Sequence, residues 1–165
     1  MRLDHKMKIS HELIEQVLAR YKPQQRVLVD ANLDYPLLEG DFHIGDTYYM
    51  NPPLIHATDI EIQLCLNQLV YVGIAEIMRE GLVRDLGGFN FLELQGENML
   101  IIESRKRFRR PIPTNRNIHC ALNIKRFRGN NGLILSWSDF QFENYSCIGS
   151  LELALVKPNL RQNDN

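Results

Sequence analysis

The sequence predicts an α+β fold in which an antiparallel sheet wraps around one long, buried helix. Residues 58–80 form a long apolar segment with a helix start signal and a helix stop signal. Residues 99–156 form four strand-like segments, which favours a sheet that follows the helix. A chain of 165 residues fits one domain, so we expect residues 1–165 to fold as one unit, with about 1–9 and 158–165 frayed.

The composition limits the classes of function. The formal net charge is -1, so a broadly basic nucleic-acid-binding protein is not expected. No apolar run approaches the ~18 residues of a membrane span, and the first residues lack the apolar core of a signal peptide. Cys65, Cys120 and Cys147 are widely spaced, which favours buried free thiols. We therefore expect a cytoplasmic protein without a membrane span.

The first elements are a short helix and a strand. Ser10 is a cap residue, and the apolar positions that follow it have helical spacing. We expect this amphipathic helix to end near Tyr21, since Pro23 stops it. Residues 25–32 are apolar and β-branched, which predicts a strand.

Two short strands are predicted over residues 40–51. Gly45 and Asp46 form the turn signal between them. Pro52 and Pro53 then indicate a loop, because proline removes backbone donors that a regular ladder needs.

The long helix has a clear beginning and end. Thr58 and Glu61 have the spacing of a capping box, and Gly81 is the expected residue just after the helix. Residues 62–78 are apolar on nearly every side, which is typical of a helix buried on most of its surface.

Four long strands are predicted after this helix, within residues 99–112, 117–128, 133–144 and 146–156. The sequence RGNNG favours a hairpin between the second and the third. A sheet of this kind around one long helix is the hotdog architecture.

Two neighbouring amides, Asn67 and Gln68, interrupt the apolar helix. A buried amide without partners costs roughly 1–3 kcal/mol, so each must be hydrogen-bonded or face a wet cavity. Asn67 either bonds a neighbouring loop or projects into a substrate cleft, where it would share one helix face with Gln63 and Tyr71. Gln68 lies about 100° around the helix, so it would face a strand or a subunit interface.

The segments GDFHIGDTYY, HATDIEIQLCLNQLVY and NMLIIESRKRFRRPI resemble the FcoT-like family of hotdog acyl thioesterases. The resemblance runs from about Tyr21 to Ile124 and is densest from Gly40 to Tyr71. This family includes a long-chain acyl-CoA thioesterase of mycobacteria and relatives encoded with isonitrile lipopeptide pathways.

The resemblance implies a set of site residues. The family lacks the carboxylate that other hotdog enzymes carry on the central helix, and it has an asparagine and two tyrosines as proposed site residues. These positions fall on Asn67, Tyr49 and Tyr21, and His56 also matches a family position. In this fold the cleft commonly lies between subunits, so the resemblance implies a homodimer or a higher homo-oligomer.

Thioester hydrolysis needs a held carbonyl, donors for the oxyanion and an activated water. Tyrosine hydroxyls and the Asn67 amide can donate, but none is a good base near pH 7. His56 precedes the helix cap and has the side chain that titrates near neutral pH, so it is either the base or a structural residue. The histidines show no metal-ligand spacing, and we expect no metal and no cofactor.

The segment RKRFRR is the one basic feature. In a strand, Arg105, Arg107 and Arg109 share one face. They form either a solvated strand end or a phosphate site for coenzyme A or a phosphopantetheine arm.

Three functions fit these residues better than a dehydratase, which normally needs a histidine and a carboxylate that face each other across the cleft. The first hypothesis is a thioesterase acting on fatty acyl-CoA or acyl carrier protein. The second is an enzyme that adds glycine to an enoyl thioester on a carrier protein. The third is an acyl-thioester-binding protein without catalysis, which the missing carboxylate base would favour. The acyl chain length stays open.

Overall fold

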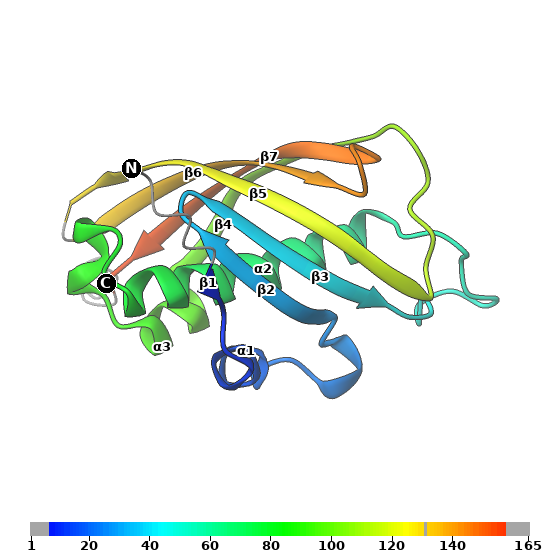
Figure 1. The fold of residues 1–165 in the computed structure, drawn as a ribbon, viewed down its shortest axis with the longest axis horizontal. Helices are drawn as coiled ribbons and strands as arrows, with labels where there is room; N and C mark the ends of the chain where they lie inside the picture. Colours follow the sequence, from blue (N-terminus) through cyan, green and yellow to red (C-terminus); the bar gives the residue numbers. More distant parts are fainter. Residues whose placement is uncertain (1–6, 131, 158–165) are drawn as a thin grey trace, which may run out of the picture.

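The computed structural model describes residues 7–130 and 132–157, which form one seven-stranded antiparallel sheet around a central helix (Figure 1). The strands lie in the order β1-β2-β3-β5-β6-β7-β4, and every neighbouring pair is antiparallel. Their bounds are Met7–Lys8 (β1), Leu28–Asp34 (β2), Leu37–Ile44 (β3), Met99–Phe108 (β4), Arg116–Gly129 (β5), Leu133–Phe142 (β6) and Cys147–Val156 (β7). This is the predicted α+β hotdog fold.

The central helix α2 spans Asp59–Arg79 and has the predicted ends. Thr58 caps it with both hydrogen bonds of a capping box to Glu61, and Gly81 follows it with a φ of 63°. By length and composition alone α2 could cross a membrane, contrary to the expectation from the sequence, but 72% of its apolar window is buried inside the molecule. Its apolar character is therefore that of a core helix.

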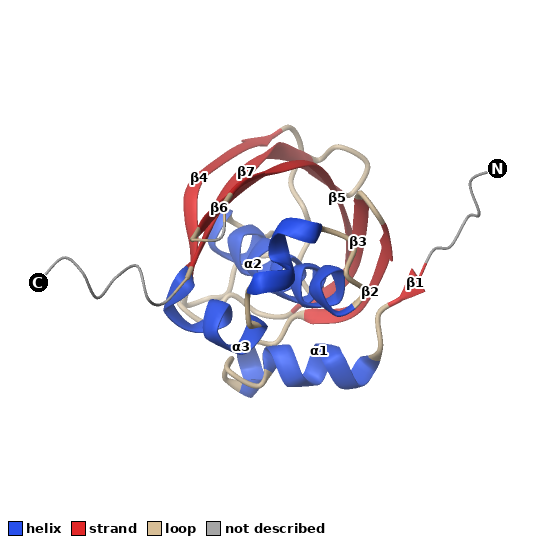
Figure 2. Cartoon of the chain, turned by 90° about the vertical axis from the view of Figure 1, so that its left-hand side faces the viewer, coloured by secondary structure: helices blue, strands red, loops and turns tan. Residues whose placement is uncertain are grey.

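The sheet arches over α2, and smaller helices cover the side that it leaves open (Figure 2). The helix α1, His11–Leu18, has the predicted Ser10 cap and buries Ile14, Val17 and Leu18. The segment after α2 is a run of short helices. They are η2 (Arg84–Gly88), α3 (Phe91–Glu93) and a π-helical turn, η3 (Leu94–Asn98); a further short helix, η1 (Pro23–Gln25), follows α1.

The expectation of two short strands over residues 40–51 is wrong. Residues 40–44 belong to β3, and its hairpin partner is β2, which turns at Tyr35 and Pro36. Residues 45–58 instead form a loop, in which the Thr47 hydroxyl accepts a hydrogen bond from the Leu54 amide at 2.6 Å. Met7–Lys8, expected to be frayed, pairs with β2, and residues 1–6 and 158–165 lie outside the described residues.

The strand β4 lies at one edge of the sheet, next to β7. It carries three consecutive exposed apolar side chains, Leu100, Ile101 and Ile102, which are 41%, 43% and 52% exposed. An edge strand with free backbone groups and apolar side chains can pair with another chain.

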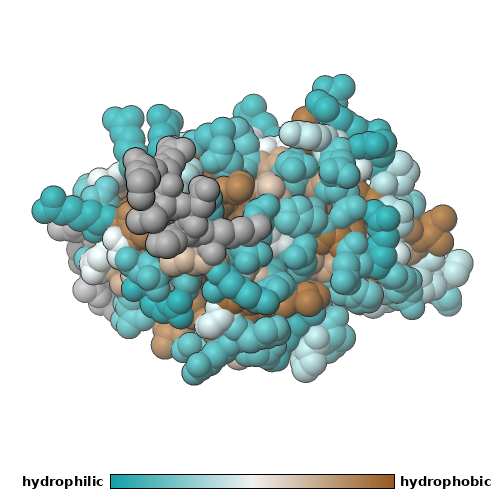
Figure 3. Space-filling view, viewed as in Figure 1, coloured by the Kyte–Doolittle hydropathy of each residue, from teal (hydrophilic) through white to brown (hydrophobic). Residues whose placement is uncertain are grey.

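The core lies between the sheet and α2. Cys65, Cys120 and Cys147 are all buried free thiols there, as predicted. The face of the molecule in Figure 3 is mostly hydrophilic, with apolar side chains scattered among polar ones.

Candidate functional site

The two neighbouring amides of α2 have different surroundings. Gln68 is fully buried, and its Oε1 accepts from the backbone amides of Val27 and Leu28, both at 3.0 Å. Its Nε2 donates to the carbonyl of Gln25 at 2.6 Å. Gln68 therefore holds the segment that leads into β2, and its side chain has no free capacity for a ligand.

Asn67 is half-buried, and only part of the hydrogen-bonding capacity of its side-chain amide is used. Its Oδ1 accepts from Gln63 Nε2 at 2.9 Å, and Gln63 Oε1 accepts from the hydroxyl of Ser104 on β4 at 2.8 Å. Within the described residues, the Asn67 Nδ2 group has no hydrogen-bond partner. This chain fixes the orientation of the amide and leaves its N–H groups to donate elsewhere.

Gln63, Asn67 and Tyr71 lie on one half-exposed face of α2, as their spacing predicts. The Tyr71 ring packs against Tyr21, with 6.4 Å between the ring centroids. Burial raises the pKa of both hydroxyls, and the nearby Arg20 guanidinium partly offsets the rise at Tyr71. Both tyrosines are therefore protonated donors near pH 7.

Tyr49 lies at the start of α2. Its hydroxyl donates to Thr58 Oγ1 at 2.7 Å, and Thr58 Oγ1 donates to Glu61 Oε2 at 2.7 Å. The Glu61 carboxylate also accepts from the Thr58 backbone amide at 2.7 Å. Burial alone would raise the pKa of Glu61, but hydrogen bonds from Tyr49 and Thr58 hold it below its ordinary value. Glu61 is therefore an ionised capping group.

His56 is exposed beside a cavity of about 430 Å³ at the start of α2. Its backbone bridges to Pro113, which anchors the loop that precedes the helix. Residues 56–59 line this cavity on one side, and residues 108–111 line it on the other.

The four predicted catalytic residues thus form two groups in one chain. Tyr49 and His56 lie at the start of α2, and Asn67 and Tyr21 lie near its middle, around Tyr71. Asn67 is nine residues past the Thr58 cap, which places it about 13 Å along the helix axis. One chain therefore does not bring all four side chains to one point.

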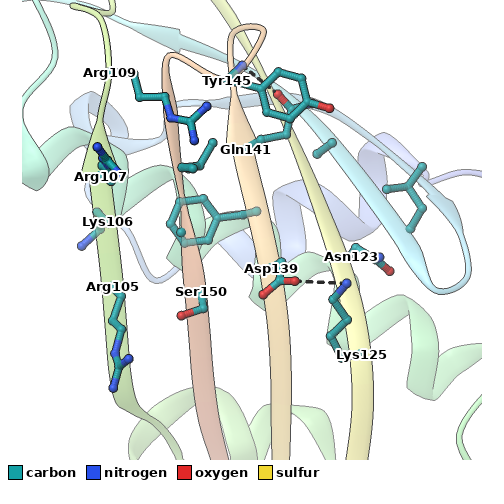
Figure 4. Close-up of a pocket in the computed structure, with 15 residues that line it drawn as sticks. Arg105, Lys106, Arg107, Arg109, Asn123, Lys125, Asp139, Gln141, Tyr145 and Ser150 are labelled. Carbon is teal, nitrogen blue, oxygen red and sulfur yellow. Dashed lines mark hydrogen bonds and ion pairs between the residues drawn. The ribbon is translucent and has the colours of Figure 1, made fainter.

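Arg105, Arg107 and Arg109 line a hollow of about 830 Å³ on the outer face of the sheet (Figure 4). This face is opposite to the one that packs on α2, where Lys106 pairs with Asp59 at 2.8 Å. Arg105 pairs with Glu103 at 2.8 Å, whereas Arg107 and Arg109 form no ion pair within the described residues. Arg109 also lines the cavity beside His56, so it lies between the two hollows.

Two candidate site residues near Asn67 were not predicted from the sequence. Arg20 and Gln95 line a pocket of about 210 Å³ together with Tyr21, Tyr71 and Gly96. Arg20 directly precedes the predicted site residue Tyr21 in the sequence, which was the one local signal for it. Nothing in the sequence indicated Gln95.

The antiparallel sheet and the long central helix define a hotdog protein. More specifically, residues 16–155 match the model of the FcoT-like thioesterase domain, and the chain belongs to that family.

Among curated proteins, the chain is similar to the (2E)-enoyl-ACP glycyltransferase of Mycobacterium tuberculosis. The two are 33% identical over 112 residues, which cover 63% of this chain and 61% of the relative. The counterpart from Mycobacterium marinum is 31% identical and is covered to 60%, with 63% of this chain matched. The match thus spans about three fifths of the length of these relatives.

Solved structures support the fold. A mutant thioesterase from Pseudomonas aeruginosa matches with a TM-score of 0.54 at 11% identity, covering 87% of this chain and 93% of that one. Zebrafish thioesterase superfamily member 2 matches with the same TM-score of 0.54 at 7% identity, covering 87% and 94%.

Proposed function

We propose that this protein is an enzyme that binds an acyl thioester on α2 and adds glycine to it. The observation that carries the proposal is the state of Asn67. Gln63 and Ser104 fix its oxygen, and its N–H groups are left without a partner in the described chain. A preorganised donor of this kind stabilises negative charge that develops on a thioester oxygen.

The surroundings of Asn67 favour an amine over water as the nucleophile. Water needs a general base to become a good nucleophile, whereas the fraction of glycine that has a neutral amine is nucleophilic without one. The flanking helix carboxylates, Glu61 and Glu76, lie six and nine residues from Asn67, about 9 and 13 Å along the axis. Glu61 is engaged by Thr58. Glu76 Oε1 pairs with Arg79 at 2.7 Å, whereas its buried Oε2 has no hydrogen-bond partner in the described residues. Distance along the helix therefore separates Glu76 from Asn67. The glycyltransferase names of the mycobacterial relatives agree with this choice.

The reaction proposed is a conjugate addition to a (2E)-enoyl thioester. The lone pair of the neutral glycine nitrogen forms a bond to the β-carbon, and the C=C π electrons move to give a thioester enolate. Asn67 donates to the enolate oxygen. The proton lost by nitrogen is returned to the α-carbon, so nothing leaves and the thioester bond stays intact.

Hydrolysis is the second candidate, because the family model describes a thioesterase domain. It would use the cavity at the start of α2, where His56 is the available base and the Thr58 region supplies the positive end of the helix dipole. This route places the reacting carbonyl near the helix start instead of near Asn67.

The substrate carrier is a phosphopantetheine arm, on an acyl carrier protein or in coenzyme A. Arg109 supports this proposal because it lines both the outer hollow and the cavity beside His56. Arg107 and Arg109 have no ion-pair partner in the described chain, so their guanidinium groups are available for a phosphate. Arg105, which pairs with Glu103, would contribute less.

A second copy of the chain completes the site in this proposal. The exposed apolar edge of β4 supports pairing of the two sheets. The half-exposed face of α2 beside β4, which includes Asn67, would then lie at the interface. Tyr49 of one subunit would thereby be able to serve the Asn67 of the other.

The test follows both products in one reaction. The protein is incubated with glycine and (2E)-enoyl thioesters of increasing chain length, on a carrier protein and on coenzyme A. Mass spectrometry detects the glycine adduct, and a thiol reagent detects hydrolysis. An adduct above the enzyme-free rate, lost in Asn67→Ala, is expected. Thiol release without adduct would reject addition and favour hydrolysis, and neither product would favour a binding protein.

A further inference from the structure

The pocket beside Tyr21 has the features of a site for a small anion. It has a volume of about 210 Å³ and lies where the residues after α1, the middle of α2 and the π-helical turn meet. This is below the roughly 300–1,000 Å³ of pockets for drug-sized ligands. Arg20, Tyr21, Tyr71 and Gln95 give it a mainly polar lining.

Three of these side chains have unused donors. Within residues 7–130 and 132–157, the Arg20 guanidinium makes no ion pair or hydrogen bond, and the hydroxyls of Tyr21 and Tyr71 have no partner. The Tyr21 and Tyr71 hydroxyls are not sealed from solvent either. Arg20 is exposed and the two tyrosines are half-buried, so all three donors can be reached from solvent. Their convergence on one pocket suits a ligand that accepts hydrogen bonds.

Gly96 gives the guanidinium its place in the pocket. A Cβ at position 96 would lie 3.0 Å from Arg20 Nη1 and 3.5 Å from Nη2. A methyl group there would require the guanidinium to shift by a few tenths of an ångström. Arg20 also acts electrostatically on Tyr71, whose pKa it lowers against the effect of burial, which agrees with their common place at the pocket.

The pocket lies next to the proposed reaction centre. Tyr71 is four residues after Asn67 on the same face of α2, about 6 Å along the axis. A molecule of a few atoms, held at one end by Arg20 and Tyr71, would therefore extend toward the thioester on Asn67.

We propose that Arg20, Tyr21 and Tyr71 bind the carboxylate of the amino acid nucleophile and aim its amine at the enoyl thioester. The inference rests on the proposed function and deepens it by assigning the second substrate to a site. A guanidinium matches a carboxylate through two parallel hydrogen bonds, and the two hydroxyls complete its lone pairs. The pocket is too small and too polar for an acyl chain, which separates an amino acid from a fatty acid product.

The test measures glycine binding and turnover separately. Binding of ¹³C-glycine is followed by NMR, with and without a bound enoyl thioester, in wild type, Arg20→Gln and Gly96→Ala. Decanoate and methylamine serve as comparison ligands, since the first has a carboxylate on a long chain and the second has an amine without a carboxylate. Arg128→Gln is the matched control, because Arg128 is exposed and lies on β5, away from the pocket lining.

Arg20→Gln is expected to weaken glycine binding, and to raise the KM for glycine, on the order of 10- to 100-fold, with little change in the KM for the thioester. Gly96→Ala should have a smaller effect in the same direction, and Arg128→Gln should have none. Decanoate and methylamine should not compete with glycine for the pocket.

The two proposals fail differently. An active wild type whose KM for glycine is unchanged in Arg20→Gln would overturn the pocket assignment and leave the addition reaction standing. Glycine binding that depends on Arg20 in a protein without addition activity would support the pocket and overturn the reaction. No glycine binding by wild type, with or without thioester, would overturn the assignment, and decanoate binding that depends on Arg20 would reassign the pocket to a product carboxylate.

Discussion

The start and the middle of α2 both carry polar side chains, but they use them differently. At the start, Tyr49, Thr58 and Glu61 form hydrogen bonds with one another. In the middle, Asn67 and Tyr71 keep donors without partners in the described chain. The comparison shows that polarity on a buried helix does not by itself mark a site. A closed set of hydrogen bonds stabilises the fold, whereas an open set is available to a ligand.

The largest effect is expected for Asn67→Ala. Loss of a donor to an oxyanion costs on the order of 10²- to 10³-fold in turnover, and the same loss is expected here. Asn67→Asp, of nearly the same shape, should be equally impaired, because a carboxylate repels a developing negative charge. Adduct formation measured by mass spectrometry checks both variants, with Gln16→Ala on the exposed side of α1 as the control. Turnover within about threefold of wild type in Asn67→Ala would move the reaction centre toward the helix start.

Gln68→Ala should have the opposite effect, with a large loss of stability and little change in turnover. The change leaves the backbone amides of Val27 and Leu28 and the carbonyl of Gln25 without their partner in a buried place. We expect a loss of roughly 2–4 kcal/mol in the free energy of unfolding. Asn67→Ala, one residue away, should lose less than about 1 kcal/mol.

Urea unfolding followed by circular dichroism compares these two alanine variants directly. Equal losses of stability in Gln68→Ala and Asn67→Ala would contradict the assignment of a structural role to Gln68 and a ligand-binding role to Asn67. Activity per folded molecule in Gln68→Ala should remain near that of wild type.

A mixing experiment tests whether Tyr49 at the start of α2 and Asn67 in its middle meet across a subunit interface. Tyr49→Phe removes the hydroxyl that donates to Thr58 and should reduce turnover by about tenfold if that hydroxyl also serves the site. In a mixture of Asn67→Ala and Tyr49→Phe subunits, half of the dimers are heterodimers with one intact site. Activity should then recover to about a quarter of that of wild type.

Sedimentation analysis of the same samples gives the control, since recovery requires dimers that exchange subunits. Activity of the mixture at the mean of the two variants, in exchanging dimers, would place Tyr49 and Asn67 in separate roles. Tyr49 would then be a support for the helix cap alone.

The sequence predicted those features that local signals determine. Thr58, Glu61 and Gly81 lie within a turn of the helix ends that they set, so their spacing was enough to place α2. The hairpin at Tyr35 and Pro36 was missed because the Gly45-Asp46 pair is the stronger local turn signal. Pairing of β3 with both β2 and β5 overrides that signal, since it satisfies both backbone edges of the strand.

The site was predictable only in part, because its chemistry depends on contacts between distant segments. Helical spacing placed Asn67 and Gln68 on different faces of the helix, but only the contacts with Gln25, Val27 and Leu28 show that Gln68 is the structural one. Arg20 lies 76 residues before Gly96 in the sequence, yet its guanidinium lies 3.0 Å from where a Cβ at that glycine would stand. No periodicity or motif encodes such a contact.

The smallest expected effect is that of the Glu61 charge, at the start of α2, on the stability of the fold. The folded-state pKa of Glu61 lies below its ordinary value of 4.5, so its charge stabilises the fold above that value. This contribution should fall as the pH drops through the folded-state pKa. Glu61→Gln keeps the capping geometry without the charge, and it should be less stable than wild type by about 0.5–1 kcal/mol near pH 7.

The measurement is the free energy of unfolding of both proteins from pH 7 down to the acid limit of reversible folding. The difference should shrink toward zero at low pH, because Glu61 is then neutral in wild type as well. Glu93→Gln, at an exposed position in α3, is the control, because it also removes one negative charge from the chain. A difference that stays constant with pH would mean that the glutamine disturbs packing at the cap. If the turnover of Glu61→Gln were also lower than that of wild type across the same pH range, the start of α2 would take part in the reaction. The start and the middle of α2 would then no longer differ in role.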